Sequence, residues 1–291
     1  PWNDELEIGW WDEFVGVNKL IDTQKYFVVC ANYLGGCYGT TGPNSIDNKT
    51  GLEYGENFPN ISFKDIETSQ KQLLDDLGVK SLKAVIGPSI GGLMALEFSL
   101  LYPDYVENLI SISSGYKLST IQLLHNLEQA YVLNLAKGSP DRKDEYLSLA
   151  RMIAHKTYIS LELLASRAKG ESKYGEDIIN GFLSTSQESY MMHQGEKFIE
   201  RFTHESYNSI IKGWQSFSID VKKIERLKDI KVLVVSVDSD VCFYPEEQSE
   251  FVKLLEANQI NVTHKTISST KGHDCFLLEP DLFEKELGKF I

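Results

Sequence analysis

Short apolar runs alternate with amphipathic stretches along much of this chain. Five runs rich in β-branched and aromatic residues predict strands: Tyr26–Ala31, Lys83–Gly87, Asn108–Ser113, Lys231–Val237 and Asn261–Ile267. Four stretches with apolar residues at helical spacing predict helices: 62–78 with Ser62 as its N-cap, Ile90–Leu101, Glu246–Ala257 and Pro280–Phe290. This alternation predicts an α/β fold with a mostly parallel central sheet that helices cover on both faces.

The alternation stops in the middle of the chain. From about Ser119 to Phe217 the pattern predicts long helices, including Lys143–Lys169 and Glu176–Phe202, and no strand. A helical insertion between two halves of an α/β sheet usually covers a site. We therefore expect a core built from 1–118 and 218–291, with a helical cap formed by 119–217.

Composition and charge narrow the class of protein. Of the 291 residues, 42% are hydrophobic and 24% are charged, which excludes a disordered or fibrous chain. We expect no membrane span and no secretion signal, because every apolar stretch is short and residues 1–20 lack a basic start before an apolar run. The net charge of −13 argues against nucleic acid and anionic membranes as partners, while leaving room for a local basic pocket.

The four cysteines give no sign of a metal site. Cys30, Cys37, Cys242 and Cys275 form neither a C-x-x-C pair nor a cluster with zinc-ligand spacing. We expect four free thiols in a reducing cytoplasm.

A nucleophile motif follows the second predicted strand. Gly87-Pro88-Ser89-Ile90-Gly91 has the pattern G-x-S-x-G, and a predicted helix begins immediately after the serine. In this context the serine lies on a tight strand-to-helix turn at the carboxyl end of the sheet. We predict that Ser89 is a nucleophile and that the backbone N–H of Ile90 stabilises the developing oxyanion.

A serine nucleophile needs a base and an acid, which in this fold come later in the chain. Four of the six histidines lie in the helical insertion and His264 lies inside a strand, so His273, in the loop after the last strand, is the expected base. The acid should follow the strand Lys231–Val237, where Asp238 and Asp240 are both candidates. Chain order alone leaves that choice open.

The chain resembles the homoserine O-acetyltransferases of the α/β-hydrolase superfamily along nearly its whole length. The segments that carry the resemblance are Gly9–Asp12, Leu34–Pro43, the turn at Ser89, Ala150–Ile153, Gln194–Phe198, Ser239-Asp240 with Phe243 and Pro245, and Gly272–Asp274. The runs Gly35–Pro43 and Gln194–Phe198 are far more specific than the turn at Ser89, because general hydrolases lack them.

The resemblance implies an α/β-hydrolase fold and a role for several residues. In such proteins the nucleophile, acid and base fall at Ser89, Asp240 and His273, so the resemblance selects Asp240 over Asp238. The substrate-binding arginine and aspartate of the family align with Arg151 and Asp274.

The resemblance also implies the reaction. Acetyl-CoA acylates the serine, the acyl group passes to the hydroxyl of L-homoserine in methionine biosynthesis, and no metal or redox cofactor takes part. Such proteins are often homodimers.

Two features depart from the family pattern. Pro88 stands where the family usually has a glycine. The chain also opens after the point at which family members have formed their first strands, so we expect those strands, and the second oxyanion-hole N–H that they normally carry, to be missing from it.

Other functions compete with this one. A succinyl donor or a serine acceptor fits the same family, and a serine esterase fits the same scaffold, although Arg151 in the cap argues against an esterase. A non-catalytic binding protein or an inactive fragment is the alternative from a different class.

Overall fold

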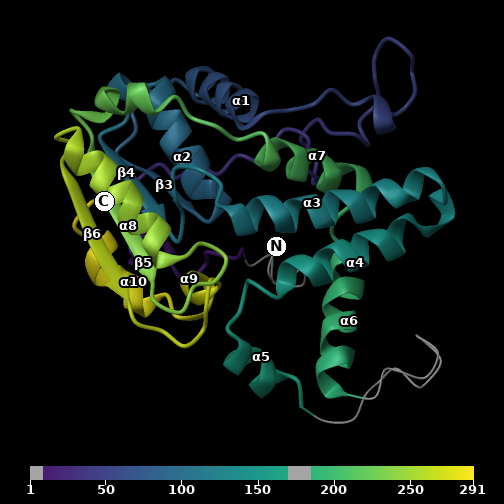
Figure 1. Cartoon of the computed structure of the whole chain (residues 1–291). Coiled ribbons are helices and arrows are strands. Elements are labelled where there is room, and N and C mark those ends of the chain that lie inside the picture. The colour runs from purple at the N-terminus through teal and green to yellow at the C-terminus, as the bar shows by residue number, and fades with distance from the viewer. Residues whose placement is uncertain (1–8, 170–184) are drawn as a thin grey trace. The chain divides into compact units, whose positions relative to one another are not determined.

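The computed structural model describes residues 9–169 and 185–291, which form two compact units (Figure 1). The first unit comprises the described part of Pro1–Ala31, Gln70–Lys117 and Ile219–Ile291. The second comprises Asn32–Ser69 and the described part of Leu118–Ser218. The described part of the segment expected as a helical cap, 119–217, lies in the second unit together with 32–69.

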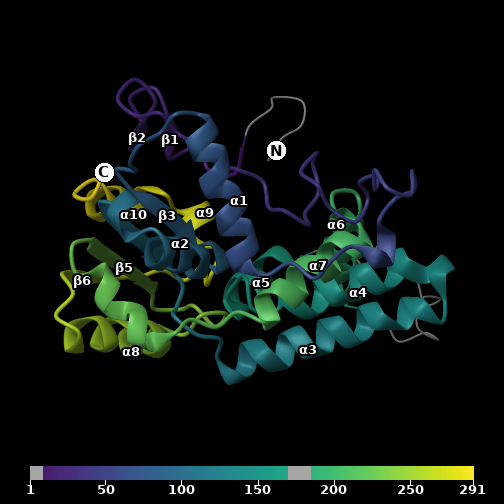
Figure 2. The same ribbon diagram turned by 90° about the horizontal axis from the view of Figure 1, so that it is seen from above.

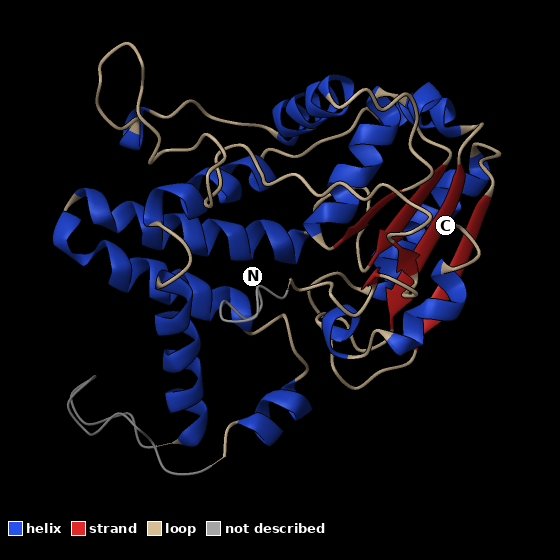
Figure 3. Ribbon diagram, turned by 180° about the vertical axis from the view of Figure 1, so that it is seen from behind, coloured by secondary structure: helices blue, strands red, loops and turns tan. Residues whose placement is uncertain are grey.

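A four-stranded parallel sheet organises the first unit (Figure 3). Its strands, in spatial order, are β3 (Val85–Pro88), β4 (Asn108–Ile112), β5 (Lys231–Val237) and β6 (Val262–Ile267). Four of the five predicted strands are therefore confirmed, each within two residues at either end. Because neighbouring strands are parallel, their carboxyl ends lie along one edge of the sheet.

Helices cover both faces of this sheet, as the alternation of strands and helices predicted. On β5, Val232 and Val234 pack with α2 (Ile90–Leu101) and α8 (Pro245–Ala257). The intervening Leu233 and Val235 pack with α9 (Cys275–Leu278) and α10 (Asp281–Leu287). Successive side chains of a strand point to opposite faces, so a strand buried on both sides is apolar throughout.

One predicted strand is wrong. Tyr26–Ala31 is an irregular segment, and no described strand pairs with it. Phe27 is 73% exposed, and Val28 and Val29 are exposed as well. The composition of this run suits a strand, but in the described residues β3 pairs only with β4, so the run has no ladder to join.

Helix α1 (Phe63–Asp76) begins in the second unit and ends in the first. Ser62 caps it, as predicted: the Ser62 backbone N–H donates to the Asp65 carboxylate at 2.9 Å, and the Asp65 N–H donates to the Ser62 hydroxyl at 3.3 Å. Shorter elements complete the described chain: β1 (Val15–Gly16), β2 (Ile21–Asp22) and the 3₁₀ segments Gly55–Asn57, Pro103–Tyr105, Leu135–Lys137, Pro140–Arg142 and Val221–Leu227.

The described part of Leu118–Ser218 is mainly helical. Its helices are α3 (Thr120–Asn134), α4 (Lys143–His155), α5 (Leu161–Arg167), α6 (Ser186–Ile199) and α7 (His204–Gln215). Helix α3 packs beside α4 and α7 (Figure 2). In the described residues, no helix is both long and apolar enough to cross a bilayer.

Two predicted cap helices differ from the structure. The expected helix Lys143–Lys169 is two helices, because the chain turns after His155 and the Ser160 hydroxyl caps a new helix by accepting the Leu163 N–H at 3.1 Å. The helix expected at Glu176–Phe202 corresponds to α6, whose first turn is capped by Thr185 and Glu188. Residues 176–184 of that prediction lie outside the described part.

Candidate active site

Ser89 occupies a strained turn between β3 and α2. Its φ of 57° and ψ of −130° fall in a sparsely populated region for a non-glycine residue, a conformation that costs about 1–3 kcal/mol and is concentrated at functional sites. The backbone holds it there, since the Ser89 N–H donates to the Ile112 carbonyl at 2.9 Å and the Ser89 carbonyl accepts the Gly92 N–H at 2.9 Å. The side chain is half-buried.

Close approach of strand and helix explains two glycines in this turn. A Cβ on Gly87 would lie 1.9 Å from the Gly91 carbonyl oxygen, and a Cβ on Gly92 would lie 2.4 Å from the Cβ of Ser114. Pro88, which departs from the family pattern, is the last residue of β3 and lies opposite Ile112 in the sheet. The tight turn therefore forms with proline at this position.

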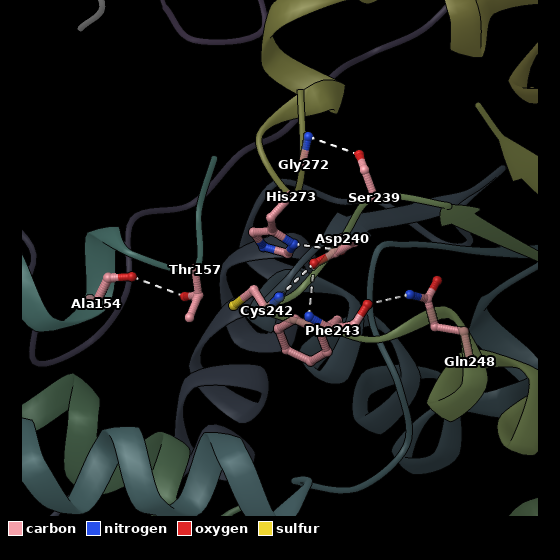
Figure 4. Close-up of polar contacts among 9 residues, drawn as sticks. All are labelled: Ala154, Thr157, Ser239, Asp240, Cys242, Phe243, Gln248, Gly272 and His273. Atoms are coloured by element: carbon pink, nitrogen blue, oxygen red, sulfur yellow. Dashed lines mark hydrogen bonds and ion pairs between the residues drawn. The ribbon is translucent and has the colours of Figure 1, made fainter. Parts of the chain in front are cut away.

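Asp240 and His273 form a buried pair in the loops that follow β5 and β6 (Figure 4). His273 Nδ1 and Asp240 Oδ2 are 2.8 Å apart, and each residue is 2% exposed. The other carboxylate oxygen, Oδ1, accepts the backbone N–H groups of Cys242 at 2.8 Å and Phe243 at 2.9 Å. These bonds hold the carboxylate in one orientation toward the imidazole.

The two aspartates after β5 have different partners. Asp238 accepts the Ser269 backbone N–H at 3.0 Å through Oδ1, which ties its loop to the loop after β6. A second tie joins the Gly272 N–H to the Ser239 hydroxyl at 3.0 Å (Figure 4). The structure therefore pairs His273 with Asp240.

Aromatic rings enclose the imidazole. Phe243 stacks on His273 with ring centroids 5.5 Å apart, and Phe276 meets it edge-on at 5.5 Å. Burial alone favours the neutral ring, but the charge of Asp240, its hydrogen bond and the charge of Asp274 together raise the pKa of His273 above 6.5. From the sequence, Phe243 was named only as part of the family resemblance and Phe276 was not named, although each ring lies within three residues of a predicted site residue.

Asp274 is the N-cap residue that precedes the short helix α9. Its side chain is partly exposed, and its backbone carbonyl accepts the N–H groups of Leu277 and Leu278. The next residue, Cys275, is buried, and burial raises the pKa of its thiol to about 12. This thiol therefore stays protonated and is a poor nucleophile beside the histidine.

Ser89, Asp240 and His273 follow the carboxyl ends of β3, β5 and β6. Those ends share one edge of a parallel sheet, which is where α/β proteins place their catalytic groups. The acid–base pair is in direct contact, and the serine lies at the same edge. This arrangement suits acyl transfer through a serine.

Arg151 lies on α4 in the second unit, with its guanidinium over two aromatic rings. Its guanidinium carbon is 4.8 Å from the ring centroids of both Tyr158 and Phe198. In the part of the chain that the structure describes, no carboxylate is within ion-pair distance of it. Stacked guanidinium groups keep their in-plane donors available for a carboxylate.

The run Gln194–Phe198 on α6 builds this environment. A Cβ on Gly195 would lie 2.2 Å from the Ser148 hydroxyl oxygen and 3.3 Å from a Met152 side-chain atom, so only glycine allows α6 to approach α4 this closely. Phe198, from the same run, supplies one of the two rings at Arg151.

The glycine-rich run Leu34–Pro43 packs within the second unit as well. Gly35 has a φ of +83°, and a Cβ there would lie 2.7 Å from the hydroxyl oxygen of Ser209 on α7. The Ser206 hydroxyl of the same helix donates to the Gly36 carbonyl at 3.2 Å. This run therefore shapes a loop against α7.

The remaining candidates for redox or metal chemistry are the cysteines, histidines and acidic side chains. All four cysteines are free thiols, as predicted. Among residues 9–169 and 185–291, no cluster of three or more histidine, cysteine or acidic side chains is arranged to hold a metal ion.

Comparisons with known proteins agree with this geometry. A model of the alpha/beta hydrolase fold family matches residues 7–280. The chain is 40% identical to the homoserine O-acetyltransferase of Methanosalsum zhilinae, covering 97% of this chain and 60% of that protein. The Haemophilus influenzae homoserine O-acetyltransferase is 36% identical, with 99% and 83% covered. A homoserine O-succinyltransferase of Magnetococcus marinus is also 36% identical, with 99% and 78% covered.

A solved structure supports the same assignment. The homoserine O-acetyltransferase of Bacillus anthracis superposes with a TM-score of 0.87 at 26% identity, covering 98% of this chain and 81% of that one. The chain spans about 60% of the length of the first curated relatives that it matches. The chain belongs to the α/β-hydrolase fold family and, within it, to the homoserine O-acetyltransferase family.

Proposed function

We propose that the protein transfers an acetyl group from acetyl-CoA to the hydroxyl of L-homoserine through an acyl-serine intermediate. The observation that carries this proposal is the buried Asp240–His273 pair at the sheet edge that also bears the strained Ser89. The names of the relatives support acetyl-CoA and homoserine as substrates. No metal or redox cofactor is needed.

In the first half-reaction, neutral His273 removes the proton from the Ser89 hydroxyl. The serine oxygen attacks the thioester carbon, and the Ile90 N–H stabilises the oxyanion. The tetrahedral intermediate collapses, coenzyme A leaves as the thiolate and takes the proton from His273, and acetyl-Ser89 remains. Asp240 holds the proton of the imidazole on Nδ1, so that Nε2 is the basic atom.

In the second half-reaction, His273 removes the proton from the homoserine hydroxyl. The homoserine oxygen attacks the acetyl carbon, and the intermediate collapses to O-acetylhomoserine as Ser89 takes the proton back from His273. The helical cap of the second unit is proposed to limit the access of water, which would hydrolyse acetyl-Ser89.

The acceptor is a zwitterion, so its site needs a cation and an anion. Arg151 suits the carboxylate, because two rings orient its guanidinium and no described acid neutralises it. Asp274 suits the ammonium, because it is partly exposed and adjacent to the base. A plain esterase needs neither charge, and consumption of acyl-CoA with and without amino acid separates the two activities.

We also propose that the chain is cytoplasmic and pairs with a second copy of itself. Four apolar residues on one face of α3 are 39–68% exposed: Leu123 and the adjacent Leu124, then Leu127 and Tyr131. Such a stripe can pack against its own copy around a two-fold axis.

An acyl-enzyme on Ser89 is the first prediction. Incubation with acetyl-CoA should give one acetyl group on the peptide spanning Ile86–Leu93, and steady-state kinetics should be ping-pong. Ser89→Ala should lose turnover by several orders of magnitude. Intersecting kinetics without a trapped acyl-serine would contradict the mechanism.

The second prediction concerns the two aspartates. Asp240→Asn should lower kcat roughly 10⁴-fold, because an amide leaves the imidazole in the wrong tautomer. Asp238→Asn is the matched control and should be mild, since the hydrogen bond that its carboxylate makes among the described residues is to a backbone N–H. The reverse order of severity would show that the acid is misassigned.

A pH profile tests the electrostatics of the same pair. His273 works as the neutral base, and its pKa is raised, so acylation should fall as the pH drops through a value above 6.5. Asp274→Asn removes one of the charges that raise the pKa of His273, so the loss of acylation at acidic pH should shift to lower pH. A midpoint of this loss below pH 6.5 in the unaltered protein would contradict the proposed electrostatics.

The fourth prediction separates the half-reactions. Arg151→Ala should retain a stoichiometric burst of coenzyme A thiol but transfer acetyl to homoserine about tenfold to a hundredfold less efficiently, the effect of losing a charge-assisted hydrogen bond. Loss of the burst in a folded variant would remove Arg151 from the acceptor site.

The fifth prediction concerns assembly. Light scattering should give the mass of two chains, and replacing both Leu127 and Tyr131 with glutamate should give the mass of one. Leu161→Glu is the control, because Leu161 is 76% exposed on α5, outside the stripe. A single-chain mass for the unaltered protein would reject the pairing.

A further inference from the structure

A buried histidine lies one helical turn after Arg151. His155 is the last residue of α4 and is only 4% exposed. Its ring is edge-on to that of Tyr158, with the ring centroids 6.0 Å apart, and its centroid is 5.9 Å from that of Tyr190 on α6. The guanidinium of Arg151 lies over the same Tyr158 ring, so the histidine and the arginine contact one aromatic side chain.

The two ring nitrogens of His155 have different surroundings. Nε2 is 3.4 Å from the hydroxyl oxygen of Tyr190. Nδ1 is fully buried, and among the described residues it has no hydrogen-bond partner. A buried polar atom without a partner costs about 1–3 kcal/mol, so such atoms in native structures usually serve a ligand or a mechanism.

The charge state of His155 restricts what it can do. Burial and the positive charges of Arg151 and Arg167 lower the pKa of His155 to about 4. At neutral pH the imidazole is therefore uncharged, with one N–H donor and one lone pair. When the Tyr190 hydroxyl donates to Nε2, the proton of the imidazole is on Nδ1.

A carboxylate is the ligand that suits this pair of groups. It has two oxygens and about four acceptor positions, more than one guanidinium edge uses. A neutral N–H beside the arginine adds a directional donor without a second positive charge. Phe198, the second ring at the guanidinium, supplies no polar atom.

We propose that His155 is a specificity-determining residue of the acceptor site, whose Nδ1–H donates to the amino-acid carboxylate held by Arg151. This inference depends on the proposed function, because it takes Arg151 as the carboxylate anchor. The donor makes the site prefer a carboxylate over a neutral group of the same shape. Its action is confined to the second half-reaction.

Two substitutions separate the two nitrogens. In His155→Asn the amide lies where Nδ1 was and cannot reach Tyr190, whereas in His155→Gln the amide reaches the position of Nε2 and leaves that of Nδ1 empty. Each purified variant is assayed for the coenzyme A burst and for kcat/KM with L-homoserine and with its carboxamide. Tyr190→Phe is the control for the Nε2 contact.

The expected result is a split between the variants. His155→Gln should raise the KM for homoserine about tenfold, with the burst unchanged and the preference for homoserine over the carboxamide reduced by the same factor. His155→Asn and Tyr190→Phe should stay within a few-fold of the unaltered protein. If His155→Gln does not fold, His155→Phe, which keeps the ring and removes both nitrogens, gives the same readout.

Other outcomes overturn the inference. Equal losses for homoserine and the carboxamide, or a defect in His155→Asn with a normal His155→Gln, would mean that His155 acts only through packing or through Tyr190. If Arg151→Ala raises the KM for homoserine and His155→Gln does not, only the role of His155 is wrong. If Arg151→Ala leaves that KM unchanged, the acceptor site of the proposed function is wrong.

Discussion

The hydrogen bond between Asp240 and His273 is the constraint on which the rest of the site depends. Both groups are almost fully buried, and an unpaired carboxylate or a freely turning imidazole at this depth would be costly. The pair is tolerated because two backbone N–H groups hold the carboxylate and two aromatic rings hold the imidazole. The parallel pairing of β5 with β6 brings the two loops together, with Val237 opposite Ile267.

The serine depends on the same sheet in a different way. Its backbone is strained, and the neighbouring strand β4 maintains that strain through the Ile112 carbonyl. Glycines at 87 and 92 let strand and helix approach closely enough for the turn to form. The sheet thus holds the serine in a strained backbone conformation and places the histidine beside a buried carboxylate. Both residues lie at the same edge of the sheet.

The second unit positions a cation, the guanidinium of Arg151, in a protein whose net charge is negative. The net charge is −13, yet among the described residues Arg151 contacts two aromatic rings and has no carboxylate within ion-pair distance. The close approach of α4 and α6 at Gly195 makes this possible, because it brings Phe198 against the guanidinium. A neutral His155, which contacts the same Tyr158 ring as Arg151, adds a polar group without adding charge.

Local pattern was enough to predict much of this protein. Four strands, the helices that cover the sheet, the serine turn and the position of His273 follow from apolar periodicity, glycine spacing and chain order, which act over a few residues. Local pattern failed for Tyr26–Ala31, because strand composition forms a strand only where a neighbouring strand supplies hydrogen bonds. It also missed the break after His155, where the hydroxyl of Ser160 begins a new helix.

The tertiary structure decided what local pattern left open. Asp238 and Asp240 are two residues apart in one loop, and residue type and chain order do not distinguish them. The resemblance favoured Asp240, and the structure shows the physical reason: one aspartate meets a backbone N–H and the other meets the imidazole. The rings at Arg151, and the buried His155 nitrogen that has no hydrogen-bond partner in the described part of the chain, were likewise beyond sequence patterns. Contacts between different helices and burial from every side depend on the packing of the folded chain.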